Sequence, residues 1–171
     1  AGTGGFGIVS DSIGSCSEAQ QWIITIFMFI FGVNFSFYYL LLFRKFAQAF
    51  KMEEVRWYFI IYVSVVVLIT INIVDVIGNT NDAIRYSAFQ VSSIMTTTGY
   101  STVDFNVWPT FSKGLLLLVM FFGGCAGSTA GGIKISRFVL GFKAMAKEVK
   151  KMIHPQRVKI TKMDGKAISD E

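Results

Sequence analysis

The stretch Thr96-Thr97-Thr98-Gly99-Tyr100-Ser101 lies between two strongly apolar regions of the chain. A helix-sized segment at residues 82–95 comes directly before it and is too polar to make a comfortable membrane span. Polar backbone is tolerated at membrane depth only where protein buries it or where it lines a watery path. A Thr-x-Gly-Tyr string after a short helix is the arrangement with which potassium channels offer carbonyl oxygens to a dehydrated ion. The stretch therefore predicts part of an ion-conducting pore and favours potassium as the ion.

The composition around this stretch is that of a membrane protein. Apolar residues make up 53% of the chain and charged residues only 16%. A run of about 20 apolar residues is long enough to cross a hydrocarbon core. Three such runs occur, at residues 21–43, 57–77 and 111–142, the last with a glycine-rich interruption. A buried helix of a soluble protein can be equally apolar, but three runs in 171 residues favour membrane spans.

Basic residues gather in the loop after the first run and in the tail after the third. The positive-inside rule then makes the N-terminus external and the C-terminus cytoplasmic. Three crossings satisfy this orientation, whereas a fourth crossing by residues 82–95 would put the lysine-rich tail outside. We therefore expect a pore helix at residues 83–96 that enters and leaves on one side, followed by a filter loop at 97–101. The basic residues flank spans rather than an aromatic-rich soluble domain, which argues against a nucleic-acid partner.

A second glycine-rich stretch, residues 3–7, has the same order of residue types as residues 97–101, and both precede an apolar run. Such self-similarity predicts a repeated unit of helix, pore helix, loop and helix; chance similarity of glycine-rich turns is the alternative. The unit makes candidate ion-binding filter residues of Thr3, Gly4, Gly5, Phe6, Thr97, Thr98, Gly99 and Tyr100, with potassium held by backbone carbonyls.

The two aromatic side chains of these loops, Phe6 and Tyr100, are expected to anchor them by packing against surrounding protein. One loop cannot surround an ion, so four loops are required, from four chains or from four repeats in one chain. The two loops differ in sequence, which favours inequivalent repeats within one chain. Each has one firmly placed glycine instead of a full Gly-Tyr-Gly, which predicts weaker discrimination between potassium and sodium.

The third apolar run is interrupted at residues 123–132, where five of ten residues are glycine. Each glycine costs a helix roughly 1 kcal/mol relative to alanine. One interpretation is close helix packing through the GxxxG spacing of Gly123 and Gly127. The other is an unwound segment below the filter that gates it, with the hydroxyls of Ser128 and Thr129 facing water or ions. The candidate gate residues are Gly123, Gly124, Gly127, Ser128, Thr129, Gly131, Gly132 and Lys134.

Single polar residues elsewhere give weaker signals. Lys134 either reaches the inner membrane interface or holds the gate or a cytoplasmic partner. Asn34, inside the first run, is expected to hydrogen-bond between helices. Cys16 and Cys125 are expected to be unpaired, and the only histidine, His154, lacks partners for metal binding or catalysis. The sequence therefore predicts neither an enzyme nor a covalently bound cofactor.

Taken together, residues 32–36, 88–100, 122–134 and 153–155 give the chain a resemblance to the Trk/Ktr/HKT superfamily of potassium transporters, and within it to the bacterial TrkH type. The resemblance covers nearly the whole chain. It implies an all-α membrane protein in which four non-identical helix–pore helix–filter loop–helix repeats form one pore per chain. Residues 1–52 would be the end of one repeat, residues 53–151 a complete repeat with a broken third span, and residues 152–171 a cytoplasmic linker to a missing repeat.

The same resemblance implies potassium uptake through a pore-forming subunit in the bacterial inner membrane. Gly5 and Gly99 fall on the family's filter glycines and residues 123–132 on its intramembrane gating loop, whereas Gly7 stands where a small polar residue is more usual. Potassium would be the substrate, and the implied partners are membrane lipid, a second copy of the subunit and a cytoplasmic, TrkA-like nucleotide-binding ring. The fragment alone is expected not to conduct. The alternatives are a subunit of a homotetrameric two-helix potassium channel and a non-conducting membrane scaffold.

Overall fold

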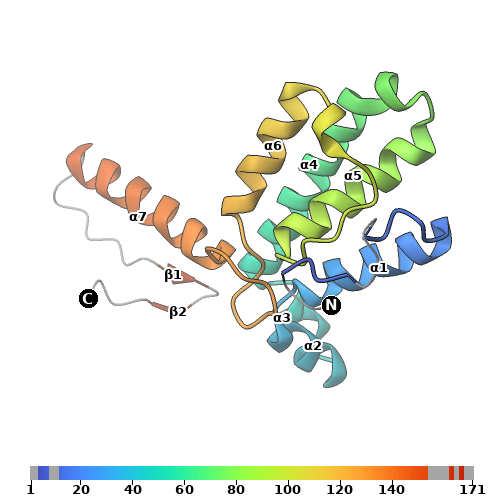
Figure 1. Ribbon diagram of the computed structural model, residues 1–171. Coiled ribbons are helices and arrows are strands. Elements are labelled where there is room, and N and C mark those ends of the chain that lie inside the picture. Colours follow the sequence, from blue (N-terminus) through green and yellow to red (C-terminus); the bar gives the residue numbers. More distant parts are fainter. Residues whose placement is uncertain (1–3, 8–11, 154–161, 164–165, 168–171) are drawn as a thin grey trace.

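The computed structural model describes residues 4–7, 12–153, 162–163 and 166–167, and it is mostly helical. Helices α4, α5 and α6 lie side by side, α1 packs against α5, and α7 extends away from this bundle (Figure 1). A two-residue antiparallel strand pair near the C-terminus is the exception to the predicted all-α class. The elements are α1 (Glu18–Phe31), α2 (Phe35–Leu42), α3 (Phe46–Ala49), α4 (Glu53–Ile77), α5 (Thr80–Met95), η1 (Phe105–Val107), α6 (Thr110–Phe121), α7 (Ile135–Ile153), β1 (Lys162–Met163) and β2 (Lys166–Ala167).

Helix α4 is the long apolar helix of the fold. Its 25 residues make it about 38 Å long at 1.5 Å per residue. Glu53 and Glu54 lie in its first turn, where the helix dipole favours negative charge. It ends at Gly78, which takes a left-handed conformation with φ +76°. Within the described residues it is the one continuous helix long and apolar enough to cross a membrane.

The structure divides two of the three predicted apolar runs into shorter helices. The first run is divided into α1 and α2, which are bent by 91° relative to each other and count as a second span only when taken together. The apolar part of the third run, α6, has 12 residues, fewer than a hydrocarbon core requires. The apolar length of each run is visible in the sequence, but the points where the backbone leaves helical geometry are not.

Helix α5 is polar in sequence, and yet ten of its 16 residues are buried. The Asn79 side chain caps its first turn by accepting a hydrogen bond from the Asn81 amide at 3.1 Å. Phe89 and Met95 have no exposed surface, although the helix is only 16 residues long. The helix lies where the sequence predicts one at 83–96, surrounded by α1, α4 and α6.

Three buried polar side chains of α5, those of Arg85, Ser87 and Ser92, have partners on the surrounding helices, as polar groups removed from water require. Arg85 forms ion pairs with Glu18 at the start of α1 (2.8 Å) and with Asp82 (2.6 Å). Two hydroxyl pairs join α5 to α4, Ser87 with Thr70 at 2.7 Å and Ser92 with Tyr62 at 2.9 Å. These contacts hold a short polar helix between apolar ones.

The break between α1 and α2 occupies residues 32–34. A helix end buried away from water needs partners for its last carbonyl groups. The Tyr58 hydroxyl donates to the Phe29 carbonyl at 3.0 Å, and the Tyr38 hydroxyl donates to the Ile30 carbonyl at 2.5 Å. Asn34 then caps α2 by accepting from the Ser36 amide at 2.8 Å. The expected hydrogen bond of Asn34 to another helix is also present, since its side-chain amide donates to the Glu54 carboxylate on α4 at 3.4 Å.

Candidate functional site

The two predicted filter loops lie against each other. The Gly4 amide donates to the Thr97 carbonyl at 3.2 Å, and the Gly5 amide donates to the Thr98 carbonyl at 2.7 Å. Farther along, the Ser101 amide donates to the Ser12 hydroxyl at 3.2 Å. Segments more than 80 residues apart in sequence are therefore paired. Of the eight predicted filter residues, Thr3 lies outside the described residues.

The backbones of Gly5 and Gly99 approach each other closely. Both have left-handed backbones, with φ +70° and +81°. A Cβ atom on Gly5 would lie 2.8 Å from the Gly99 carbonyl oxygen, and one on Gly99 would lie 2.8 Å from the Gly5 amide nitrogen. Both the backbone angle and the close approach therefore require glycine at these two positions.

The end of α5 holds the second of these loops in place. The Ser93 carbonyl accepts hydrogen bonds from the amides of Thr98 (2.8 Å) and Gly99 (3.3 Å), and the Ser93 hydroxyl donates to the Tyr100 carbonyl at 2.6 Å. The hydroxyls of Thr96 and Thr98 are 2.8 Å apart in the buried interior. The loop thus begins at the C-terminal end of α5, where the helix dipole supplies partial negative charge.

The loop carbonyls are not all free. The Thr97 and Thr98 oxygens each accept one amide hydrogen from the neighbouring loop. A carbonyl oxygen has two lone pairs, so each keeps the capacity for one further partner such as a cation. The predicted packing of Phe6 is wrong among the described residues, because its ring is 87% exposed on an extended loop. Tyr100 is partly buried.

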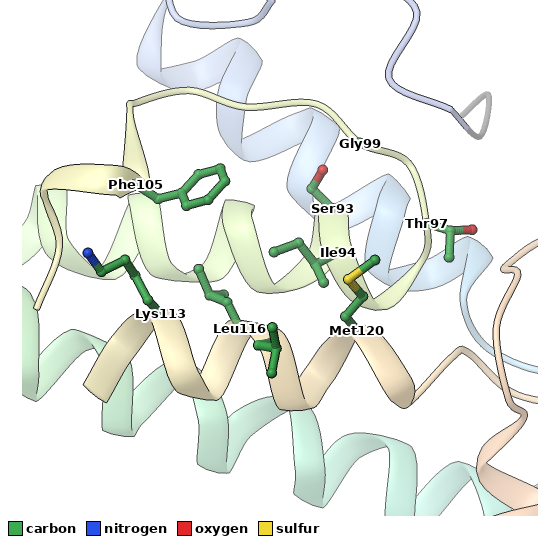
Figure 2. Close-up of a pocket in the computed structure, with 9 residues that line it drawn as sticks. Ser93, Ile94, Thr97, Gly99, Phe105, Lys113, Leu116 and Met120 are labelled. Atoms are coloured by element: carbon green, nitrogen blue, oxygen red, sulfur yellow. The ribbon is translucent and has the colours of Figure 1, made fainter. Parts of the chain in front are cut away.

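A cavity of about 460 Å³ lies behind this loop, between α5 and α6 (Figure 2). Figure 2 shows Phe105, Ile94, Leu116 and Met120 around it, with Gly99 at its edge. Its lining is almost wholly apolar. A bare cation needs oxygen ligands, so this cavity does not suit an ion.

The segment between α6 and α7, residues 122–134, is not helical and is called the glycine loop below. Its two ends are joined by a bridge between Phe122 and Ile133, with the Gly123 amide donating to the Ile133 carbonyl at 2.9 Å. The interpretation of Gly123 and Gly127 as a helix-packing pair is wrong, since neither lies in a helix. Gly127 instead has φ +66°, and a Cβ on Gly123 would collide with the Gly131 carbonyl.

The glycine loop is hydrogen-bonded to the α1–α2 break. The Cys125 amide donates to the Gly32 carbonyl at 2.9 Å, and the Phe35 amide donates to the Gly127 carbonyl at 3.1 Å. The loop also reaches the first residues after α5, because the Gly131 amide donates to the Thr97 hydroxyl at 2.8 Å. One predicted gate residue, Gly131, is thus hydrogen-bonded to a predicted filter residue, Thr97.

The polar side chains of the glycine loop bind backbone oxygens. The Ser128 hydroxyl donates to the Cys125 carbonyl at 2.7 Å, and the Thr129 hydroxyl donates to the Phe31 carbonyl at 3.2 Å. Ser128 is partly exposed and Thr129 is exposed, so the expectation that these hydroxyls also face water or ions stays a prediction. The Lys134 ammonium donates to the Ala130 carbonyl, so Lys134 closes the loop on itself.

Sequence reasoning missed one residue of this region, Glu54. Its carboxylate is 3% exposed and accepts the amides of Ala126 at 2.6 Å and Ser136 at 3.2 Å. These partners lie 72 and 82 residues farther along the chain. In the sequence, Glu54 is only the second of two acidic residues at the start of an apolar run. Acidic residues are common in the first turn of any helix, so this position gives no sign of a special role. Cys16 and Cys125 are both free, as predicted.

The chain is similar in sequence to known cation transport proteins. A family model described as TrkH, cation transport protein, matches residues 2–171. The Trk system potassium uptake protein TrkH of Escherichia coli (strain K12) is 34% identical over 171 residues, covering 98% of this chain and 35% of that protein. TrkG of the same organism, also described as a Trk system potassium uptake protein, is 31% identical over 170 residues, with the same coverage.

A solved structure has the same fold. The crystal structure of the potassium transporter TrkH from Vibrio parahaemolyticus matches with a TM-score of 0.84 at 33% identity, over 96% of this chain and 36% of that one. The chain thus spans about a third of the length of the relatives that it matches. These relatives are described as transport and uptake proteins, which agrees with the expectation that the chain is not an enzyme.

Proposed function

Because this chain belongs to the TrkH family of cation transport proteins, we propose that it forms part of a pore for potassium uptake. The main support for this proposal is the contact between Gly5 and Gly99, where two filter-like loops meet at the end of the buried helix α5. Two loops that meet at glycines can expose successive carbonyl oxygens to one path. Relatives named as potassium uptake proteins support potassium as the substrate and do not favour a homotetrameric channel or a scaffold.

The proposed ion site consists of backbone carbonyls of the two loops, residues 3–6 and 97–100. A potassium ion entering them loses water and needs oxygens in its place. The Thr97 and Thr98 oxygens provide two candidates, each with a lone pair beyond its hydrogen bond to the other loop. The end of α5 adds partial negative charge next to them. Further loops, from the part of a full-length subunit that this chain does not span, would complete the ring.

We place the pore in the bacterial inner membrane. Helix α4 would span it, α1 with α2 and α6 with α7 would cross it as broken spans, and α5 would enter and return on the outer side. The distribution of basic residues supports an external N-terminal and a cytoplasmic C-terminal side. In this scheme residues 1–52 end one pore repeat, residues 53–151 form a complete one, and residues 152–171 form a cytoplasmic linker.

The glycine loop would be the gate of this pore. It lies beside the second filter loop, as the hydrogen bond between Gly131 and Thr97 indicates. It is held by hydrogen bonds rather than by helical geometry, so it can rearrange without unwinding a helix. Its proposed gating residues are those predicted from the sequence, with Lys134 holding the loop closed through Ala130. A second copy of the subunit, membrane lipid and a cytoplasmic nucleotide-binding ring of the TrkA kind are the proposed partners.

The test uses the full-length protein that contains residues 1–171, expressed in cells that lack potassium uptake. We expect it to restore growth and uptake of potassium at low external concentration. Gly99→Ala should lower uptake by about tenfold or more, because its Cβ would overlap the Gly5 backbone, and overpacking of about 1.4 kcal/mol already corresponds to tenfold.

Gly78→Ala is the matched control. Gly78 has nearly the same φ, +76°, but a Cβ there meets nothing within 4 Å. This variant carries the backbone strain without the contact between the loops and should keep most of the uptake. The proposal is wrong if the full-length protein restores no uptake, or if the two variants transport equally well.

A further inference from the structure

Glu54 is a buried carboxylate that joins three separate elements to α4. Its Oε1 atom accepts the amides of Ala126, in the glycine loop, and of Ser136, in the first turn of α7. Its Oε2 atom accepts the Asn34 side-chain amide at 3.4 Å, at the α1–α2 break. One side chain therefore contacts both places where the backbone leaves helical geometry in the apolar regions.

The contacts account for the presence of a charge in a buried position. A buried carboxylate is costly unless hydrogen bonds compensate for the lost water. Glu54 has three donors, and one of them, the Ser136 amide, lies at a helix N-terminus, where the dipole favours negative charge. Hydrogen bonds to an ionised acceptor are roughly twice as strong as neutral ones. Glu54 thus supplies charge-assisted bonds between the loop and the α1–α2 break.

The remaining contacts between the loop and the break are of that weaker, neutral kind. The Cys125 amide binds the Gly32 carbonyl, and the Phe35 amide binds the Gly127 carbonyl. Residues 125 to 127 are thus held from both sides, by the break and by Glu54 at Ala126. The loop cannot leave the break while the carboxylate binds both Ala126 and Asn34.

We propose that Glu54 is the positioning residue of the gate: it holds the glycine loop to the α1–α2 break, and the loop opens only when these hydrogen bonds are lost. This inference rests on the proposed function, in which the glycine loop is the gate. Under this proposal the break and the loop move apart only after both have separated from Glu54 on α4.

The native thiol of Cys125 measures this opening directly. Cys125 has no exposed surface and is adjacent to Ala126, so its reaction with N-ethylmaleimide reports exposure of the loop. The experiment uses the purified full-length protein with Cys16 and any other cysteine replaced by serine. Glu54→Gln removes the charge and places an amide NH₂ against that of Asn34. We expect it to raise the labelling rate of Cys125 by about tenfold, as the loss of one charge-assisted bond predicts.

Glu53→Gln is the matched control, because it makes the same substitution one residue earlier on α4. Glu53 forms an ion pair with Lys143 on α7 and therefore also links α4 to α7, but this ion pair does not involve the glycine loop. Labelling of Cys125 should stay within twofold of the parent. Ala83→Cys in buried α5, made in a Cys125→Ser background, reports global unfolding, and Glu54→Gln should leave the labelling of this variant unchanged.

A rescue variant separates positioning from general destabilisation. Asn34→Asp keeps an oxygen to cap α2 and accepts a hydrogen bond from the side-chain amide that Glu54→Gln introduces, so the pair is restored with reversed polarity. The double variant Asn34→Asp, Glu54→Gln should bring labelling back to within about twofold of the parent. Should Glu54→Gln fail to assemble, Glu54→Asp keeps the charge but shortens the side chain, and it should raise labelling of Cys125 in the same direction.

The outcomes distinguish the two proposals. Equal Cys125 labelling in the parent, Glu54→Gln and Glu54→Asp overturns the role of Glu54, whatever the uptake. Parallel increases at Cys125 and at the cysteine in α5 also overturn it, because they indicate general destabilisation. Selective labelling that the double variant reverses supports it. Labelling needs no transport, so a full-length protein that transports no potassium refutes the proposed function alone.

Discussion

The chain leaves helical geometry twice inside its apolar regions, and the two departures are built differently. The break between α1 and α2 is short, and its carbonyl groups obtain partners from elsewhere, as Phe29 does from Tyr58. The glycine loop between α6 and α7 is long and makes many of its bonds internally, as Lys134 does with Ala130. A short break therefore depends on its neighbours, whereas a long loop stabilises itself and also supplies donors to the short one.

The largest expected effect comes from filling the space where the two departures meet. Gly124 is buried, and a Cβ there would lie 2.6 Å from the Ala130 Cβ and 2.8 Å from the Gly32 carbonyl oxygen. Gly124→Val should destabilise the full-length protein by about 3 kcal/mol, since overpacking forces backbone shifts. The midpoint of thermal unfolding in detergent measures this. An unchanged midpoint would show that the loop and the break are not in contact.

Removing the cap of the short break should have the next largest effect. Asn34→Ala loses the bond to the Ser36 amide and the contact with Glu54, and we expect a cost of about 2 kcal/mol. Asn79→Ala, at the cap of α5, is the control, because it loses a cap and an exposed hydrogen bond to Asp82 but no contact with the loop. Equal losses of stability in the two variants would mean that the contact with Glu54 contributes no more than the exposed bond between Asn79 and Asp82.

A smaller effect is expected where a neighbour supplies one hydrogen bond to the break. Tyr58→Phe removes the donor to the Phe29 carbonyl and should cost about 1 kcal/mol. Tyr62→Phe, one turn farther along α4, removes a hydroxyl that binds α5 instead. Tyr58→Phe should speed labelling of Cys125, while Tyr62→Phe should not. Faster labelling in Tyr62→Phe but not in Tyr58→Phe would show that the short break does not depend on the hydrogen bond from α4.

The smallest change in stability, and a stabilising one, is expected at a glycine that lies outside both the break and the glycine loop. Gly114 lies within α6, and a Cβ there meets nothing within 4 Å. Gly114→Ala should stabilise the protein by roughly 0.5 kcal/mol, because alanine loses less backbone freedom in a helix. A rise in the unfolding midpoint is the expected measurement. A fall would indicate that α6 packs against part of the full-length protein outside this chain.

The sequence predicts the parts of the fold that rest on local pattern. A polar helix between apolar runs is visible in residues 82–95, and glycine density reveals that the third run is interrupted. The similarity of the stretches around Gly5 and Gly99 predicts two related loops, but it does not show that they touch. Their pairing depends on helices that are brought together only by folding.

The short break and Glu54 are not predictable in the same way. Asn34 lies within a long apolar run, so the sequence suggests a polar residue inside one helix and not the cap of a second helix. A local reading of Gly32 and Asn34 could have suggested a break, but the donors that satisfy its carbonyl groups come from distant positions, Tyr58, Cys125 and Thr129. Glu54 looks like an ordinary residue of a first helical turn, since its partners are 72 and 82 residues away.

The contact of Gly5 with Gly99 also limits how this protein can vary over evolutionary time. In most tight contacts a larger residue on one side can be accommodated by a smaller one on the other. Here both positions already carry the smallest residue that proteins have, so no compensating exchange exists. Variation in this region must therefore occur around the contact, in the residues that flank it, and not within it.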